Sequence, residues 1–388
     1  MTDLSFVAIS PEVALTAGAL AVLGVDLIWN PPTRVLAWVA GMGVVAAVVA
    51  TVWQWVDAGT AQSLHYSGMV SLDRFEALAG IVMVVVAGLG LTVAWPLLEG
   101  MSRRRSEFVV LVFLSAAGFH LMAAAADLMI VFLGLEVGSI SLYVLAGFTR
   151  LRPDADEASL KYFLLGGFAS AVFLYGVALF YAAVGTTSLA GAVDYLRSTI
   201  ILSPGILLTS IALMLVGLGF KVSAAPFHMW APDVYQGAPG GIVGFMAAAA
   251  KIGGFAALAR VLVGPLAGFI DDWAPPVALL AAASIVVGTL LAVVQTDLKR
   301  MLAYSSVAHA GYMLTALVAG RDGVDAMWFY LATYVLQIVG AFAVATIVSG
   351  EGGGRTPLST LAGMSTRSPV AAAGMGTMML AMAGIPLT

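Results

Sequence analysis

The chain lacks cysteine, and this absence excludes several kinds of site. None of the 388 residues is a cysteine, so the chain can form no disulfide and can supply no thiolate to zinc or to an iron–sulfur cluster. Any iron–sulfur electron transfer would therefore have to take place in another polypeptide. The four histidines show no metal-ligand spacing, and we expect no metal site.

Charged residues are also scarce. They make up 10% of the chain, whereas apolar residues make up 61%. A soluble domain has about 25% charged residues, so most of this surface does not face water. The apolar residues form continuous runs of the roughly 20 residues needed to cross a bilayer, unlike the short alternating segments of a β-barrel. The sequence predicts an all-α, polytopic membrane protein that contacts the lipid bilayer and binds no nucleic acid.

About twelve apolar runs are predicted to span the membrane. Asp3 and the lack of a basic N-terminal stretch indicate that the first run is a retained span and not a signal peptide. The last run continues to Thr388 without a charged tail, so we expect the sequence to be incomplete at this end. The predicted spans are residues 10–30, 35–55, 75–98, 107–125, 127–148, 160–184, 205–225, 239–262, 275–296, 301–319, 325–348 and 367–388.

Basic residues are distributed unevenly between the two sets of predicted loops. Loops after odd-numbered spans hold 11 lysines and arginines, including Arg103–Arg105 and Lys299–Arg300. The other loops and span ends hold only 4, namely Arg74, Arg197, Arg260 and Arg321. Because cytoplasmic loops carry the excess of basic residues, we expect the N-terminus outside and the odd loops in the cytoplasm.

Three ionisable residues lie inside predicted spans, where a charge is costly. Glu136 and Lys251 lie about 13 and 18 Å along their helices, close to the bilayer midplane, and Lys221 lies late in the seventh span. A structural ion pair, or lysines held by backbone carbonyls, is the simpler alternative. Three such charges are more typical of a proton relay, in which Glu136 faces the bundle interior and approaches Lys221 within ion-pair or water-bridged distance.

Pro226 predicts an interruption of the seventh span close to Lys221. Proline has no N–H, so it leaves the carbonyl of Val222, four residues earlier, without its helical donor. A simple kink would explain the proline alone. Beside a buried lysine, the freed backbone is more typical of a broken helix that lines a polar cavity.

The histidines and Lys161 are further candidates. His309 and Ser305 are four residues apart and share one helix face with other hydroxyl side chains nearby, which indicates a polar stripe. His228 follows the predicted helix break, and histidine can donate or accept a proton near neutral pH. His120 is more typical of a hydrogen-bonded packing residue. Lys161 either reaches the membrane surface or serves inside the bundle.

The segments that hold these residues resemble the antiporter-like subunits of respiratory complex I, the proton-pumping NADH–quinone oxidoreductase. The most specific segment is residues 220–239, with Lys221, Pro226 and His228, and it is more similar to subunit N than to subunits L and M. The likeness extends through residues 127–148, 160–166, 297–309 and 384–386 and covers roughly residues 10–388. Leu387 stands where the family often has a second proline.

The resemblance implies an antiporter-like fold with two inverted five-helix repeats, each containing a broken helix. It divides the chain into N-terminal transmembrane helices at 1–106, a first repeat at 107–262 and an incomplete second repeat at 275–388. It implies helix breaks at Pro226 and Pro386. It also implies a proton relay made of Glu136, Lys221, Lys251, Lys161, His228 and His309.

The family likeness also implies partners and an energy source. No Walker motif or dinucleotide fingerprint is present, so another subunit would have to drive a pump of this kind. The resemblance implies that quinone reduction elsewhere in a complex of the bacterial plasma membrane supplies the energy. NAD, FMN, iron–sulfur clusters and quinone would bind to partner subunits, with no cofactor in this chain, and other membrane-arm subunits would be its neighbours. Two alternatives stay open: a subunit of a multi-subunit sodium/proton antiporter, and a non-pumping scaffold, which the buried charges argue against.

Overall fold

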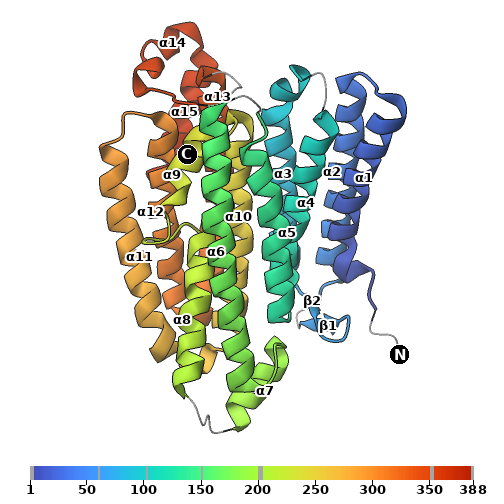
Figure 1. Cartoon of the computed structure of the whole chain (residues 1–388), viewed down its shortest axis with the longest axis vertical. Coiled ribbons are helices and arrows are strands. Elements are labelled where there is room, and N and C mark those ends of the chain that lie inside the picture. Colours follow the sequence, from blue (N-terminus) through green and yellow to red (C-terminus); the bar gives the residue numbers. More distant parts are fainter. Residues whose placement is uncertain are drawn as a thin grey trace.

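A computed structural model describes residues 4–59, 62–101, 104–149, 152–199, 204–349 and 354–385. Within them, eleven helical segments are long and apolar enough to cross a membrane, which confirms the all-α membrane class. They run side by side along the long axis of the molecule, with α1 and α2 on one flank and α11 and α12 on the other (Figure 1). They are α1 (Ser10–Trp29), α2 (Thr33–Asp57), α3 (Arg74–Glu99), α4 (Arg105–Ala124), α5 (Leu128–Ala146), α6 (Pro153–Val184), α8 (Pro204–Lys221), α10 (Gly240–Leu262), α11 (Ile270–Val293), α12 (Leu298–Val318) and α13 (Val324–Ser349).

Short elements join these helices. Strands β1 (Ser63–His65) and β2 (Val70–Leu72) pair antiparallel, with Leu64 opposite Ser71, at the same end of the bundle as the short helix α7 (Leu189–Ser198) (Figure 1). Single 3₁₀ turns are formed by Val7–Ile9, Ala267–Phe269, Gly320–Gly323 and Leu358–Leu361.

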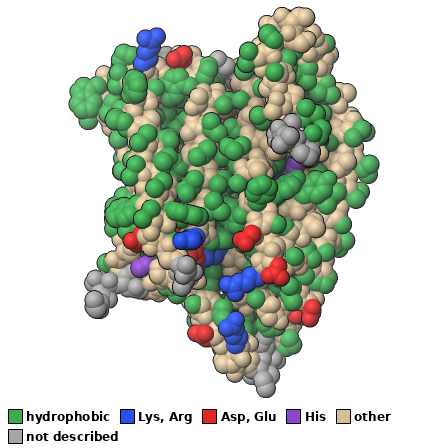
Figure 2. All heavy atoms as spheres, turned by 180° about the vertical axis from the view of Figure 1, so that it is seen from behind, with side chains coloured by type: hydrophobic (Ala, Val, Ile, Leu, Met, Phe, Trp, Pro, Cys, Tyr) green, Lys and Arg blue, Asp and Glu red, His purple; other side chains and the backbone are tan. Residues whose placement is uncertain are grey.

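The outer surface is largely hydrophobic. Figure 2 shows apolar side chains over most of one face, with charged side chains gathered towards the ends. Large apolar residues such as Leu27, Trp38 and Leu279 are more than two-thirds exposed. Contiguous apolar surface of this extent is typical of a membrane or protein–protein contact and not of a surface exposed to water.

Helix α10 lies at the centre of the bundle. All of its residues except Arg260 are buried, and its many glycines and alanines let neighbouring backbones approach closely. A Cβ on Gly241 would lie 2.8 Å from the Cα of Ala94 on α3, and one on Gly244 would lie 3.0 Å from the Cα of Val339 on α13. Lys251 is therefore held on a helix that is enclosed on every side.

The seventh predicted span is broken, as the position of Pro226 predicts. Helix α8 ends at Lys221, Ser223 has a left-handed φ of 61°, and α9 (Trp230–Gly237) begins only after the proline. Other helices satisfy part of the exposed backbone. The N–H of Ala225 donates to Ser284 Oγ on α11 at 2.8 Å, and Trp230 Nε1 donates to the carbonyl of Phe220 at 3.0 Å.

The twelfth predicted span differs from expectation. Residues 367–388 begin within α14 (Met364–Arg367) and continue as α15 (Pro369–Met382). The helix is interrupted at Ser368 because a residue that precedes proline is driven out of the helical conformation. The 14 residues of α15 are fewer than the roughly 20 that cross a bilayer. The predicted break at Pro386 lies outside the described residues.

Candidate functional site

Lys221 occupies a buried aromatic chamber at the end of α8. Its side chain is 2% exposed, and Nζ donates a 2.7 Å hydrogen bond to Ser139 Oγ on α5. Three aromatic rings lie 5.6–5.7 Å from Nζ, those of Phe119, Tyr143 and Tyr162. Ring faces and a hydroxyl oxygen both stabilise an ammonium group, so the chamber can hold the charged lysine.

Of the two arrangements predicted for Glu136 and Lys221, a direct ion pair or a water-bridged contact, the structure does not show the direct ion pair among the described residues. The carboxylate is half-buried on α5, and no ion pair joins it to Lys221 among the described residues. Ser139, three residues later on the same helix, takes the lysine instead and donates its own hydroxyl to the carbonyl of Leu135. Positions three apart lie on one helix face, so Glu136 is one turn away from the acceptor that Lys221 uses.

Lys251 binds to the helix break itself. It is 1% exposed, and its Nζ donates a 2.9 Å hydrogen bond to the carbonyl of Val222. This is the carbonyl that Pro226, four residues later, leaves without a helical donor. The two buried lysines are thus linked through adjacent residues, because Lys221 directly precedes the carbonyl that Lys251 binds.

Aromatic side chains continue this arrangement from Lys251 to His309 on α12. The Tyr334 ring of α13 lies 6.0 Å from Lys251 Nζ and 4.8 Å from the His309 ring. A 2.7 Å hydrogen bond joins His309 Nδ1 to the Tyr330 hydroxyl. We call this series the lysine axis: Lys221, the Val222 carbonyl, Lys251, Tyr334, His309 and Tyr330.

His228 and Pro226 lie in the segment between α8 and α9. His228 is half-buried, and its ring centre is 6.2 Å from that of Tyr304 on α12. Its Nδ1 is enclosed and has no hydrogen-bond partner among the described residues. The histidine therefore lies beside the helix break without a direct bond to the lysine axis.

Lys161 lies at the end of the bundle that carries α9, away from Lys221. Its side chain is 41% exposed and pairs with Glu157 at 2.6 Å and with Asp233 at 2.7 Å. Asp233 also pairs with Arg300 on α12 at 2.6 Å. These residues line a cavity of about 250 Å³. This position agrees with the surface interpretation of Lys161, and Asp233 ties α6 and α12 to α9.

Lys299 is enclosed, although the hydropathy of the sequence predicts that it lies in a cytoplasmic loop. It is 0% exposed, and its Nζ has no hydrogen-bond partner among the described residues. The nitrogen lies 3.5 Å from where a Cβ on Gly240 would be. Asp297 caps α12 by accepting from the N–H of Arg300. An aspartate at an N-cap is a recognised helix start and would have placed Lys299 inside the span.

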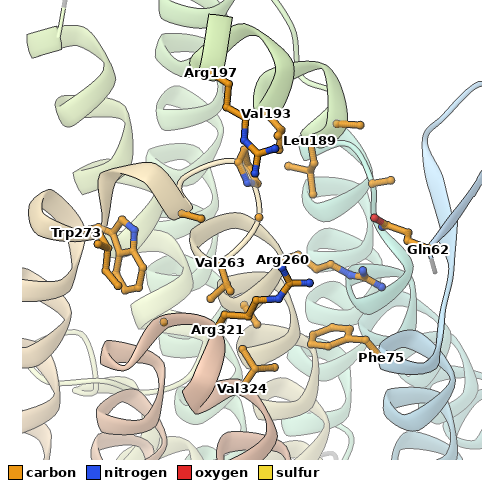
Figure 3. Close-up of a pocket in the computed structure, with 18 of the residues that line it drawn as sticks. Gln62, Phe75, Leu189, Val193, Arg197, Arg260, Val263, Trp273, Arg321 and Val324 are labelled. Atoms are coloured by element: carbon orange, nitrogen blue, oxygen red, sulfur yellow. The ribbon is translucent and has the colours of Figure 1, made fainter. Parts of the chain in front are cut away.

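A cavity of about 660 Å³ lies at the opposite end of α10 (Figure 3). Arg197, Arg260 and Arg321 line it together with Phe75 and Trp273. These three arginines are among the four basic residues that the sequence places on the side of the membrane with fewer basic residues. Three of those four therefore line one cavity. Arg260 is held by two hydrogen bonds to Asp73, of 2.5 and 2.8 Å. None of the lining residues belongs to the lysine axis.

Comparison with known families identifies close relatives. The family described as NADH:quinone oxidoreductase/Mrp antiporter, TM, matches residues 125–388. The chain is 40% identical over 382 residues to NADH-quinone oxidoreductase subunit N of Trichlorobacter lovleyi, covering 98% of this chain and 78% of the relative. It is 39% identical to NADH-quinone oxidoreductase subunit N 2 of Roseiflexus castenholzii, with the same coverage.

Solved structures show the same fold. A chain of respiratory complex I from Thermus thermophilus has a TM-score of 0.78 at 34% identity and covers 97% of this chain and 79% of that one. A chain of an archaeal membrane-bound sulfane sulfur reductase has a TM-score of 0.86 at 25% identity, covering 99% and 79%. A chain of the Mrp complex from Dietzia has a TM-score of 0.83, covering 99% and 72%, and at 22% identity it shows the fold alone.

Proposed function

The chain belongs to the subunit N family of NADH-quinone oxidoreductases, and from this premise we propose that it carries protons along the lysine axis. The observation that carries the proposal is the hydrogen bond from Lys251 Nζ to the Val222 carbonyl. It joins a buried proton donor to the broken helix, one residue beyond a second buried lysine. A packing role requires neither lysine, because apolar side chains would fill the same space at lower cost.

Proton transfer begins in this proposal at Lys221. Burial disfavours the charged form of an ionisable group, whereas an opposite charge favours it. Lys221 can turn from Ser139 towards Glu136, which lies one turn away on the same face of α5. Pairing with the carboxylate would retain a proton on Lys221, and loss of the pair would release that proton towards Lys251. Such coupled groups titrate together as a unit.

The second part of the path runs from Lys251 to α12 and α13. His309 can accept and donate a proton through its two ring nitrogens, and one of them is already bonded to the Tyr330 hydroxyl. The hydroxyls of Tyr334 and Ser306 are enclosed beside this path. They can serve as relay groups between Lys251 and His309. Lys161, His228 and Lys299 are proposed to act near the cytoplasmic side of the path.

The energy for transport would come from partner subunits. A cysteine-free chain supplies no thiolate for an iron–sulfur cluster, so NAD, FMN, the clusters and quinone are assigned to other subunits of the complex. We propose a bacterial inner-membrane location, with the N-terminus outside and other membrane-arm subunits as neighbours. We also propose the division into helices 1–106, a first repeat 107–262 and a second repeat 275–388.

Replacing Lys251 with alanine tests the proposed function. We expect Lys251→Ala to abolish most proton translocation and to slow quinone reduction, because the central ionisable group of the axis is lost while the complex still assembles. The measurement is proton uptake by membrane vesicles, normalised to the content of assembled complex. Arg34→Ala is the control, since Arg34 is an exposed basic residue on α2. Full translocation by a well-assembled Lys251→Ala complex would refute the proposal.

A further inference from the structure

A second group of ionisable side chains lies inside the membrane-spanning helices, apart from the lysine axis. Its members come from four helices and lie at the end of the bundle that carries α7. Gln54 and Glu76 are 0% exposed, His120 is 1% exposed and the Glu12 side chain is 15% exposed. We call these residues the glutamate cluster: Glu12 on α1, Gln54 on α2, Glu76 on α3 and His120 on α4.

The cluster consists of two bonded pairs. His120 Nδ1 lies 2.7 Å from Glu12 Oε1, and Gln54 Nε2 donates to Glu76 Oε1 at 2.8 Å. Gln54 is itself fixed by a second bond from Nε2 to the carbonyl of Ala8, at 3.1 Å. Each carboxyl group therefore has one oxygen in a hydrogen bond and a second oxygen that can bind a proton.

The remaining polar atoms of the two pairs are buried. His120 Nε2, Glu76 Oε2 and Glu12 Oε2 are all enclosed and have no hydrogen-bond partner among the described residues. His120 Nε2 lies 2.6 Å from where a Cβ on Gly80 would be. Gly80 is one helical turn from Glu76 on the same face of α3. The imidazole therefore packs against α3 one turn from the residue that carries the Glu76 carboxyl group.

The charges of the cluster do not balance without added protons. Three charges act on Glu76: the carboxylate of Glu12, the guanidinium of Arg260 on α10 and the carboxylate of Asp73 at the start of α3. Arg260 already forms a two-bond ion pair with Asp73. A proton on His120 balances Glu12, but it leaves Glu76 as an uncompensated buried charge, which is strongly unfavourable. Neutrality therefore requires a second proton on the carboxyl groups.

The arginine-lined cavity lies close to the start of α3, which carries Glu76. Arg260 and Phe75 line the cavity (Figure 3), and the Arg260 guanidinium lies 4.5 Å from the centre of the Phe75 ring. Asp73, the partner of Arg260, accepts a hydrogen bond from the backbone N–H of Glu76 at 2.9 Å. The cavity and Glu76 are thus joined through Phe75, the residue before Glu76, and through the Arg260–Asp73 pair.

We propose that the glutamate cluster is a second proton-binding site, with Glu76 as its acceptor and the cavity as its route to solution. One proton from water binds a Glu76 carboxylate oxygen and forms the neutral acid, and the same O–H bond breaks when the proton leaves. His120 positions the site through its bond to Glu12. The site deepens the proposed function, because it adds a group that can hold a proton near the end of the bundle that the charge bias places outside.

Infrared difference spectroscopy of the whole complex tests the site. We expect pH steps to produce the carbonyl absorption of a buried protonated carboxylic acid, with a shift in deuterated water, and we expect Glu76→Gln to lose it. Glu99→Gln is the matched control, since Glu99 is exposed at the far end of the same helix, and it should keep the band. A band that persists in Glu76→Gln, or that is missing from the unaltered complex at every pH, would overturn the proposal.

Two further variants separate proton binding from a structural role. Gly80→Ala keeps every titratable group but places a Cβ against His120, so the band should remain and titrate over a different pH range. His120→Asn should shift that range as well. Unchanged titration in both variants would remove His120 from the site. Because the readout is the carboxyl group itself, full translocation by a Lys251→Ala complex that keeps the band would contradict the lysine axis and leave this site intact.

Discussion

At the scale of single residues, the structure explains how the buried Lys221 is tolerated. A lysine at the bilayer centre costs about 2.5–3.5 kcal/mol on insertion scales. A hydrogen bond to a charged group contributes about 1.5–3 kcal/mol, and a cation–π contact contributes about 0.5–2 kcal/mol. Lys221 has one such bond and three rings, so its environment offsets the cost without an ion pair. Glu136 therefore remains free to pair with it at another stage.

Replacing Lys221 with arginine separates charge from proton release. Arginine keeps the positive charge but does not give up its proton at accessible pH. We expect Lys221→Arg complexes to assemble and to lose most proton translocation, as Lys221→Ala complexes do. The measurement is vesicle proton uptake per assembled complex. Translocation close to that of the unaltered complex would show that Lys221 acts only as a fixed charge.

Replacing Ser139 with alanine removes the hydroxyl that Lys221 binds. The loss of this acceptor costs about 1–3 kcal/mol for a buried polar group, so we expect slower translocation in Ser139→Ala. Ser141→Ala is the control, because Ser141 bonds to the carbonyl of Val137 on its own helix and does not contact a lysine. Equal translocation rates in the two variants would contradict a role for Ser139 in holding Lys221.

The sequence predicts some of these residues better than others. Lys251 and the freed Val222 carbonyl are predictable because the cost of a buried charge and the missing proline N–H are local properties. The bond from Lys221 to Ser139 is not, because the side chain that it meets depends on the rotation of α5 against α8. Hydropathy alone predicts that the span begins at residue 301 and that Lys299 lies in the preceding loop. In the structure the Asp297 cap starts the helix at Leu298.

At the scale of elements, the break between α8 and α9 is held by bonds from other helices. Such bonds replace the intrahelical ones that the interruption removes. The N–H of Ala225 is bonded by Ser284 of α11, which also donates its hydroxyl to the carbonyl of Leu280. The irregular segment is thus fixed by the second half of the chain, which the sequence around Pro226 does not reveal.

Ser284→Ala leaves the buried N–H of Ala225 without its acceptor. We expect the variant to lower the free energy of unfolding by about 1–3 kcal/mol, seen as a lower melting temperature of the detergent-solubilised complex. Ser210→Ala is the control, since Ser210 on α8 is equally buried and bonds to the carbonyl of Leu207 within its own helix. Equal melting temperatures for the two variants would contradict support of the break by α11.

Helices α4 and α5 approach each other through glycine. A Cβ on Gly118 would lie 2.8 Å from the carbonyl oxygen of Gly134 and would clash with the nitrogen of Gly138. Overpacking of this kind costs about 1–3 kcal/mol, so we expect Gly118→Ala to reduce thermal stability and complex content. Gly167→Ala on α6, with open space around the new Cβ, should be neutral or slightly stabilising. Normal stability of Gly118→Ala would show that α4 and α5 can move apart at little cost.

At the scale of the whole molecule, the arrangement of helices is largely predictable from the sequence. The predicted spans and the observed helices agree along most of the chain because long apolar runs are a strong signal. The final segment agrees less well, because the turn at Ser368 depends on one proline within an apolar run. The grouping of three arginines around one cavity was not predictable, because residues 197, 260 and 321 meet only after the helices pack.

The absence of cysteine makes the proposed orientation directly testable. Ser198 on α7 and Thr366 on α14 are exposed at opposite ends of the bundle (Figure 1). With the N-terminus outside, we expect Ser198→Cys to react with a membrane-impermeant maleimide in intact cells and Thr366→Cys to react only in opened membranes. The reverse pattern would overturn the orientation drawn from the charge bias.

The enclosure of α10 has an electrical consequence. Lys251 lies midway along the 23 residues of this helix, and the surrounding helices keep lipid headgroups and bulk ions away from it. One elementary charge that crosses a potential of 100 mV changes its energy by about 2.3 kcal/mol, so a charge held halfway is subject to about half of that change. The protonation of Lys251 therefore depends on membrane voltage as well as on pH. A membrane potential opposes or promotes this protonation according to the side of the membrane from which the proton arrives.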